Sequence, residues 1–370
     1  MFIEKCFWNA IFIYQALGRR LFMIYKSQYR TKVGFHCGLG CFRNYCHYRG
    51  IDLEEEEIFF IGNGFFLSYQ EFQIPEGMFF TLSMDIFESL FSFCRQYDVS
   101  FIDGEFVNEA EAMSLLKNGI SKDRCLSINI APIACNYRSV LLGPEKMAQP
   151  CHSAVGNTHF VNPIGLNAEE TEIFISDSCV PSFHSIPYHG WANFYDIKKG
   201  WGKANFEFFI FEEQFWKRLA GCIRDIDKQR VLMEKFMSGL TGFLNAPDCS
   251  ENQYTGIKAL FKIHRMFQTI DHFPNRNQLV RFFFREWVNE SVTYHYYTLA
   301  VLKKVLPQSG LESEIQELIS KWEQWLLQML KSSFNNQIKS IRTLTYKLEI
   351  LIDKEITTYT KIMRICEVLL

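Results

Sequence analysis

The chain lacks the features that mark several large classes of protein. No stretch after residue 25 reaches about 18 uncharged apolar residues, so the sequence predicts no transmembrane helix. Lys and Arg number 39 and Asp and Glu 41, and the resulting charge of −2 provides no field that would draw the protein to nucleic acid or to an anionic membrane. No internal repeat or low-complexity segment is present. These absences argue against a dedicated nucleic-acid binder and against a membrane protein.

Cysteine is present, but not in the density of a disulfide scaffold. Twelve cysteines are spread over 370 residues, and none forms a CxxC pair. We therefore predict free thiols in a reducing compartment and a cytoplasmic protein. Residues 2–25 are apolar, but Glu4 and the pair Arg19 and Arg20 argue against a signal peptide, as does the lack of a small-residue cleavage site. We expect an amphipathic helix that packs on the domain, in preference to one that lies on a membrane surface.

Apolar and aromatic side chains are abundant. They make up 48% and 16% of the chain, which is enough for one large core or two smaller ones, and we expect two domains. In the first 205 residues, helical spacing precedes short runs of β-branched and apolar residues. The predicted helices are 37–49, 54–60, 84–97 and 108–119, and the predicted strands are 125–130, 139–142, 158–164 and 172–176. The last two strands form an antiparallel hairpin.

A layer of helices followed by a sheet predicts an α+β domain, which we place at residues 1–205. Residues 206–370 carry apolar residues at helical spacing, as at Leu311, Ile315 and Leu318. Breaks in this pattern fall near 240–250, 273–275 and 307–310. We predict a second, mostly helical domain over residues 206–370.

Cys37 is notable because it stands at the predicted start of a helix. A helix N-terminus favours the thiolate, which is the nucleophilic form of cysteine. Gly38 and Gly40 are expected to leave room for an acyl substrate, and the backbone N–H of Cys37 is placed to bind the oxyanion that forms during attack on a carbonyl. The segment therefore suggests covalent acyl chemistry with Cys37 as the nucleophile.

A thiol nucleophile needs a base and a group that orients the base. His159 lies near the start of one predicted strand of the hairpin, and Asp177 lies at the end of the other. If both meet the helix start, the three residues form a Cys–His–Asp triad. On these residues alone, a structural histidine and a turn-forming aspartate remain open alternatives.

Other groups of residues have competing interpretations. His36, Cys37, Cys41, Cys46 and His47 are zinc-ligand types, but their spacing is poor for one site, and we expect Cys41 and Cys46 to fill core space. His152, beside Cys151, is a reserve base.

Charged and aromatic clusters mostly suggest structural roles. The acidic run 54–57 is expected to be the solvated face of a short helix rather than a cation site, and residues 294–297 are expected to pack in the core. A set of basic residues precedes Cys37 in the sequence. It either forms an ordinary solvated surface, which we favour, or meets an acidic carrier protein or a phosphate-bearing cofactor arm. Its members are Arg19, Arg20, Lys26, Arg30 and Lys32.

Two segments together resemble a known family. The first is Phe35-His36-Cys37 with Asn44, Gly50 and Glu56, the last leading into Ile58-Phe59-Phe60-Ile61-Gly62-Asn63-Gly64-Phe65. It resembles the N-terminal domain of the BtrH-type acyltransferases of butirosin biosynthesis. The second is Thr158-His159-Phe160-Val161-Asn162-Pro163-Ile164-Gly165, followed by Glu172-Ile173-Phe174-Ile175-Ser176-Asp177. It is similar to the His strand and the Asp strand of that family. The resemblance covers residues 30–180.

This resemblance implies a papain-like, C39-peptidase-like fold. In it a cysteine accepts an acyl group from a carrier-protein thioester and passes it to an amine. Matched residue by residue, it implies Cys37 as nucleophile, His159 as base and Asp177 as orienting carboxylate, and it implies a helical C-terminal region. Residues 126–130 depart from the Asp and aromatic pattern that the family tends to carry. Gln28 lies too far upstream to be assigned as the oxyanion glutamine that C39 peptidases place shortly before their cysteine.

We therefore predict a thiol acyltransferase of specialised-metabolite or antibiotic biosynthesis. The expected donor is the phosphopantetheinyl thioester of an acyl or peptidyl carrier protein, and the acceptor is a small-molecule amine, with no metal and no tightly bound cofactor. The closest alternative uses the same residues with water, as a cysteine peptidase or amide hydrolase. The other is a non-catalytic binding or scaffold protein with this fold, which would be favoured if His159 and Asp177 lie far from Cys37.

Overall fold

The structure is a computed structural model that describes residues 24–75, 77–84, 86–131, 159–178, 187–224, 227–247, 253–287, 292–307, 309–334 and 338–369. It is mixed α+β with antiparallel sheets, as predicted. The chain forms two compact units, which we call the sheet unit and the helical unit. The sheet unit comprises residues 1–31, 101–177 and 187–212, and the helical unit comprises residues 32–100, 178–186 and 213–370. These units do not follow a single division at residue 205.

The sheet unit is built on a seven-stranded sheet. Its strands are β1 (Ile24–Tyr25), β4 (Ile102–Gly104), β5 (Cys125–Ile130), β6 (His159–Leu166), β7 (Glu172–Asp177), β8 (Tyr188–Asn193) and β9 (Phe208–Phe211). The order is β4-β9-β5-β6-β7-β8, with β1 on β6, and every pair is antiparallel. The predicted strands at 125–130, 158–164 and 172–176 are confirmed, as is the hairpin of β6 and β7.

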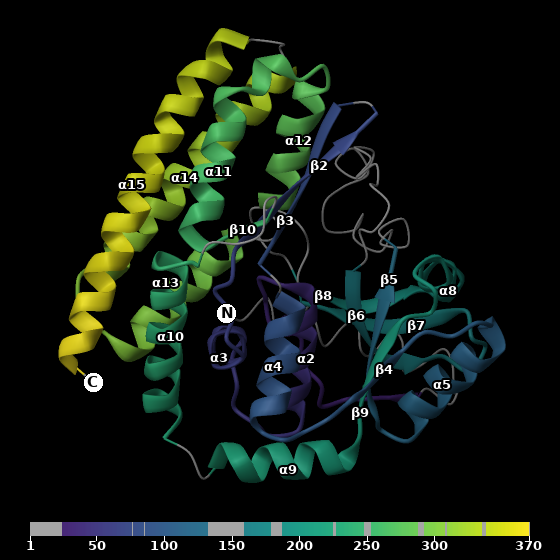
Figure 1. Ribbon diagram of the computed structural model, residues 1–370. Helices are drawn as coiled ribbons and strands as arrows, with labels where there is room; N and C mark the ends of the chain where they lie inside the picture. The colour runs from purple at the N-terminus through teal and green to yellow at the C-terminus, as the bar shows by residue number, and fades with distance from the viewer. Residues whose placement is uncertain are drawn as a thin grey trace, which may run out of the picture. The chain divides into compact units, whose positions relative to one another are not determined.

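Two helices, α5 (Glu109–Ser121) and α8 (Phe194–Lys203), pack on this sheet (Figure 1). The Asn108 side chain accepts a hydrogen bond from the Glu111 N–H at 2.9 Å, which confirms the predicted start of α5. The core between helices and sheet is apolar, and Leu116, Ile128 and Trp201 are each 0% exposed. This burial explains why the helices have one apolar face.

The strand β9 was not predicted and lies beyond the predicted domain boundary at residue 205. Its four residues are all apolar and all buried. A short run of that kind has no period that separates strand from helix. Since β9 pairs with both β4 and β5, residues 208–211 belong to the sheet and not to the helical part of the chain.

The helical unit begins with three helices and continues with the C-terminal part of the chain. Its helices are α2 (Cys37–Tyr48), α3 (Glu55–Ile61), α4 (Ile86–Gln96), α9 (Glu213–Arg224), α10 (Lys228–Leu244), α11 (Gly256–Gln268), η2 (Ile270–His272), α12 (Arg276–Glu286), α13 (Val292–Val305), α14 (Leu311–Phe334) and α15 (Ile338–Leu369). The strands β2 (Ser68–Ile74), β3 (Gly77–Ser83) and β10 (Gln253–Thr255) form a small sheet in the order β10-β2-β3. Within this unit, α14 and α15 run side by side (Figure 1).

Aromatic contacts between distant segments explain why residues 32–100 belong to the helical unit. The ring of Phe42 stacks on Trp216 with centroids 5.9 Å apart, and Phe60 meets Phe236 at 4.9 Å. Large buried rings contribute strongly to core stability. The early helices therefore pack into the same core as the helices after residue 213.

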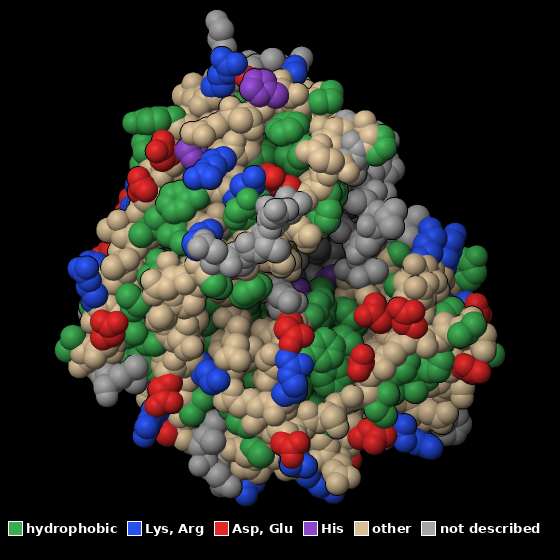
Figure 2. All heavy atoms as spheres, viewed as in Figure 1, with side chains coloured by type: hydrophobic (Ala, Val, Ile, Leu, Met, Phe, Trp, Pro, Cys, Tyr) green, Lys and Arg blue, Asp and Glu red, His purple; other side chains and the backbone are tan. Residues whose placement is uncertain are grey.

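No helix in the described part of the chain is long and apolar enough to cross a membrane. On the face drawn in Figure 2, Lys and Arg side chains are interspersed with Asp and Glu. Several predictions lie outside the described residues. They are residues 2–23 of the helix predicted over 2–25, the strand at 139–142, and the pair Cys151 and His152. Residues 24 and 25, the described end of that predicted helix, form the strand β1 instead.

Candidate functional site

His159 and Asp177 meet in the sheet unit. β6 begins at His159, β7 ends at Asp177, and Asn162 pairs with Ser176 across the hairpin. Continuing this register places Asp177 opposite Val161 and diagonal to His159, on the same face of the sheet. His159 Nε2 and Asp177 Oδ1 are 2.8 Å apart, and the two residues are 5% and 0% exposed.

This contact bears on which ring nitrogen of His159 carries the proton. When Asp177 is ionised, its carboxylate only accepts hydrogen bonds, so the Nε2–H group of His159 is the donor to Asp177 Oδ1. In the neutral ring of that tautomer, Nδ1 carries the lone pair. Because the pair is buried, this charge-assisted hydrogen bond is shielded from water and stronger than it would be at the surface.

Cys37 is the first residue of α2, as predicted. His36 caps the helix: its Nδ1 accepts from the Leu39 N–H at 3.4 Å, and its carbonyl oxygen accepts from the Gly40 N–H at 2.8 Å. These bonds leave the N–H groups of Cys37 and Gly38, which no carbonyl of the same helix can reach. The first turn holds no acidic residue, and the Cys37 thiol is free and half-buried. The two N–H groups at the helix start are donors that an oxyanion could accept from.

The glycines beside Cys37 accommodate protein side chains, which corrects the expectation that they leave room for substrate. A Cβ on Gly38 would lie 2.3 Å from the ring of Phe87, and a Cβ on Gly40 would lie 2.1 Å from Ser178 Oγ. Both distances are too short for real contacts. The space is therefore filled by Phe87 and Ser178, and a larger residue at either glycine would displace them.

The three residues singled out from the sequence belong to two units. Cys37 lies in the helical unit, and His159 and Asp177 lie in the sheet unit. The structure brings the histidine to the aspartate and places the cysteine at a helix start.

The acidic run 54–57 is not a solvated helix face, which corrects the sequence interpretation. Glu55, Glu56 and Glu57 are 2%, 8% and 3% exposed. Lys304 Nζ lies 2.6 Å from Glu56 Oε1 and 3.1 Å from Glu57 Oε1. Four consecutive carboxylates have no period that shows which face is buried, so sequence reasoning missed these roles.

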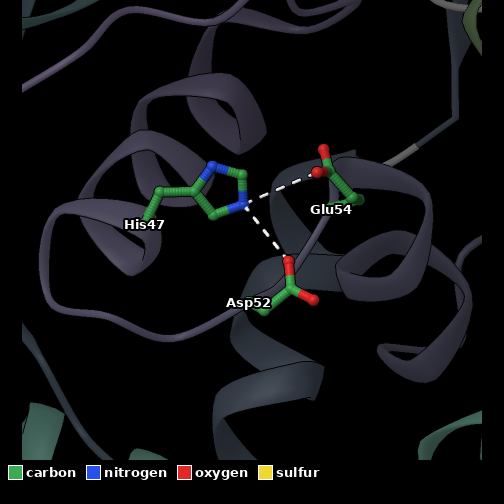
Figure 3. A group of neighbouring side chains, drawn as sticks. All are labelled: His47, Asp52 and Glu54. Carbon is green, nitrogen blue, oxygen red and sulfur yellow. Dashed lines mark ion pairs between the residues drawn. The ribbon is translucent and has the colours of Figure 1, made fainter.

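His47, Asp52 and Glu54 form a group of metal-ligand types within the described residues (Figure 3). His47 Nε2 lies 3.5 Å from Glu54 Oε1 and 4.0 Å from Asp52 Oδ1. Glu54 is, however, already paired with Lys32 and with Arg43. Burial raises the pKa of Glu54, but Lys32 and Arg43 lower it overall. Two cations at the shared carboxylate compete with a metal ion, and we interpret the group as an ion-pair network.

The cysteines of the zinc alternative do not join this group. Cys41 and Cys46 are 1% and 0% exposed, and they fill core space as expected. His36 caps α2 through its Nδ1. Among the described residues, the group of possible metal ligands contains no cysteine.

Tyr294, His295 and Tyr297 are buried in the helical unit, as predicted, but they also make polar contacts. Glu355, which is 0% exposed, accepts hydrogen bonds from the Tyr294 hydroxyl and from Trp322 Nε1, the latter at 2.7 Å. Burial and the nearby Glu355 charge raise the pKa of Tyr294 far above its ordinary value. The network ties α13 and α14 to α15.

The described basic residues before Cys37 make local contacts. Lys26 is buried and paired with Asp123 in the sheet unit, which corrects its assignment to a solvated surface. Arg30 donates to the backbone carbonyl of Tyr29 at 2.9 Å, and Lys32 pairs with Glu54 in the helical unit. Arg19 and Arg20 lie outside the described residues.

A scan against models of known protein families finds no match for this chain. A search of the curated proteins also finds no match. The resemblance to the BtrH-type acyltransferases therefore rests on the two sequence segments compared above, and it stays a prediction.

Proposed function

We propose that the protein is a cysteine-dependent acyltransferase with a papain-like catalytic arrangement, in which Cys37, His159 and Asp177 act together. The observation that carries this proposal is the buried pair of His159 Nε2 and Asp177 Oδ1, 2.8 Å apart. A free thiol at the start of α2 supplies the matching nucleophile.

Asp177 is the last residue of one stretch of the sheet unit, and the chain continues from it into the helical unit. Ser178 directly follows Asp177, and within the helical unit its carbonyl oxygen accepts a hydrogen bond from the Gly34 N–H at 2.8 Å. Its side chain lies against Gly40 in α2. Within the helical unit, Ser178 is therefore bonded to the segment that precedes Cys37.

In the first step, His159 Nδ1 takes the proton of the Cys37 thiol, and Asp177 stabilises the imidazolium. The thiolate attacks the carbonyl carbon of a thioester. The N–H groups of Cys37 and Gly38 stabilise the oxyanion. A bond from carbon to Cys37 Sγ forms, the bond from carbon to the carrier sulfur breaks, and the leaving thiolate takes the proton from His159.

In the second step, an amine attacks the acyl-Cys37 carbonyl, and His159 takes the proton that the amine loses. The new C–N bond replaces the C–S bond and regenerates the Cys37 thiolate. A thioester needs less activation than an amide, which is why a carrier-bound acyl or aminoacyl group suits this site as a donor. Water in place of the amine would give a hydrolase with the same residues.

The test is intact-protein mass spectrometry after incubation with a carrier protein loaded with an acetyl or aminoacyl group. We expect an acyl adduct on the wild type and on Cys222→Ala, and none on Cys37→Ala. Cys222 is a suitable control because it is another half-buried free thiol of the helical unit. An adduct that survives Cys37→Ala means that the assigned nucleophile is wrong.

A second measurement separates transfer from hydrolysis. The acylated protein is offered a panel of small amines in buffer, and the released product is identified by mass spectrometry. An amide supports the acyltransferase, whereas a free acid at an unchanged rate with every amine indicates a hydrolase. If no carrier loads the wild type, the acyltransferase proposal is contradicted.

A further inference from the structure

Glu55 is a buried carboxylate that the proposed chemistry does not use. It is the first residue of α3 and is 2% exposed. Its Oε2 accepts hydrogen bonds from the backbone N–H groups of Phe35 at 2.9 Å and His36 at 3.3 Å, and from the Tyr297 hydroxyl at 2.8 Å. Phe35 and His36 directly precede Cys37. One carboxylate oxygen therefore anchors the backbone that leads into the proposed nucleophile.

Arg43 binds backbone carbonyl groups of the same segment. Its side chain is 3% exposed, and its Nη2 atom lies 3.3 Å from Glu55 Oε1. The same nitrogen donates to the carbonyl oxygens of Lys32 at 2.7 Å and Val33 at 3.0 Å. Asn44 Oδ1 accepts from Arg43 Nε at 3.0 Å and from the Lys32 N–H at 3.2 Å. Side chains thus satisfy backbone groups that no regular element pairs here.

Glycines allow the carboxylate to lie between this segment and α2. A Cβ on Gly34 would lie 2.2 Å from Glu55 Oε1 and 3.4 Å from Arg43 Nη2. A Cβ on Gly40 would lie 3.0 Å from the same carboxylate oxygen. The close approach of loop, helix and carboxylate therefore depends on the absence of side chains at both positions.

Stability alone does not explain a buried charge at this place. Burial raises the pKa of Glu55, and Arg43, Tyr297 and the two backbone N–H groups oppose that rise. Replacing a buried ion pair by apolar side chains of similar volume is often neutral or stabilising. An apolar side chain, however, accepts no hydrogen bond, so it would leave the N–H groups of Phe35 and His36 without this acceptor.

We propose that Glu55 is a positioning residue for Cys37: with Arg43 it holds residues 32–36 so that the thiol is presented at the first turn of α2. The consequence for acyl transfer rests on the proposed function, whereas the effect on the thiol itself does not. Without the carboxylate, His36 no longer caps α2 in a fixed geometry, and the thiolate loses the ordered N–H groups at the helix start. The thiol therefore becomes less reactive.

The first experiment compares Glu55→Gln with Glu56→Gln, a neighbouring buried carboxylate of α3 that pairs with Lys304. Both variants react with iodoacetamide, and peptide mass spectrometry gives the alkylation rates of Cys37 and Cys222 in the same reaction. We expect the rate ratio of Cys37 to Cys222 to fall about tenfold in Glu55→Gln and to stay within about twofold of wild type in Glu56→Gln.

Whether the alkylation rate of Cys37 falls or rises in Glu55→Gln distinguishes a positioning role from a simple charge effect. Removing a negative charge near a thiol favours the thiolate, so a purely electrostatic role would speed up alkylation of Cys37 in Glu55→Gln. An unchanged or higher rate ratio overturns the proposal.

Amide hydrogen exchange provides the second readout. We expect exchange at Phe35 and His36 to become at least about tenfold faster in Glu55→Gln and to stay unchanged in Glu56→Gln. Thermal unfolding establishes that both variants are folded. If Glu55→Gln does not fold, Tyr297→Phe removes one hydrogen bond to Oε2 and keeps the charge, and faster exchange at the same two amides is still expected. Unchanged exchange in that variant overturns the proposal.

The two proposals fail in different experiments. A wild-type Cys37 that is never acylated contradicts the acyltransferase. If the alkylation ratio nevertheless falls in Glu55→Gln, the positioning role of Glu55 is supported without it.

Discussion

In the proposed mechanism, Asp177 holds His159 in the tautomer that leaves Nδ1 as the base. Asp177→Asn keeps the size of the side chain, but the neutral amide offers a donor as well as an acceptor and so no longer enforces the Nε2–H tautomer. We expect the rate of acyl-Cys37 formation to fall about 10²- to 10⁴-fold, which is the contribution of a positioned general base. Quenched-flow or intact-mass time courses measure this rate.

The matched control for this substitution is Asp103→Asn, which changes an exposed aspartate of the sheet unit. It is expected to leave the rate of acylation and the thermal unfolding midpoint unchanged. Acylation of Asp177→Asn at the wild-type rate would show that the pair with His159 is structural only.

His189 predicts a pH dependence of stability in the sheet unit. Its Nδ1 lies 2.7 Å from Thr31 Oγ1 and its Nε2 lies 3.3 Å from the Tyr25 hydroxyl. Burial, with the charge of Arg30, lowers the pKa of His189 from 6.5 to about 4. Between these values the unfolded chain binds the proton and the folded chain does not, so stability rises with pH across this window and is constant above it.

The check is a series of urea unfolding curves from pH 4.5 to pH 7 for the wild type and for His189→Asn. Other groups titrate in the same range, so the informative quantity is the difference between the two proteins. We expect the loss of stability on acidification to be smaller in the variant. Equal losses in both proteins would contradict the lowered pKa of His189.

Among the elements, two helix glycines predict opposite effects of the same substitution. Gly62 ends α3, and a Cβ there would lie 1.8 Å from the backbone oxygen of Ser89. Gly62→Ala should therefore destabilise the protein by about 1–3 kcal/mol through overpacking. Gly221 lies in the interior of α9, where a Cβ meets no atom within 4 Å, and Gly221→Ala should stabilise by about 0.5–1 kcal/mol. Chemical unfolding measures both changes, and the same sign for both would contradict this account.

Helices and strands that have a clear period of apolar residues, or a capping residue at their start, were predicted to within a few residues. The helix at Cys37, the Asn108-capped helix α5 and the hairpin of β6 and β7 each carry their signal in neighbouring residues. The strand β9 was missed because four consecutive apolar residues are compatible with strand or helix. Its pairing with β4 and β5, about 80 or more residues earlier in the chain, decides between the two.

In the molecule as a whole, each unit is assembled from separate stretches of sequence. Residues 32–100 belong to the helical unit although the stretches on both sides of them belong to the sheet unit. A cut at residue 205 would remove β9 from between β4 and β5 in the first fragment. It would also remove α2, α3 and α4 from the helices of the second.

We therefore expect that fragments 1–205 and 206–370, expressed separately, show no cooperative thermal unfolding by circular dichroism, whereas the full chain does. Co-expression of the two fragments is the control, because complementation would restore the missing strand and helices. A cooperative transition in either isolated fragment would contradict the interleaved packing.

The sequence by itself determined the α+β class, the helix that begins at Cys37 and the hairpin that carries His159 and Asp177, because spacing, caps and turns are properties of neighbouring residues. Only the tertiary structure decided that Glu55 is buried, that Phe87 and Ser178 fill the space beside Gly38 and Gly40, and that β9 completes the sheet. Those outcomes depend on contacts between residues far apart in the chain, as between Glu55 and Tyr297, and no local pattern encodes them.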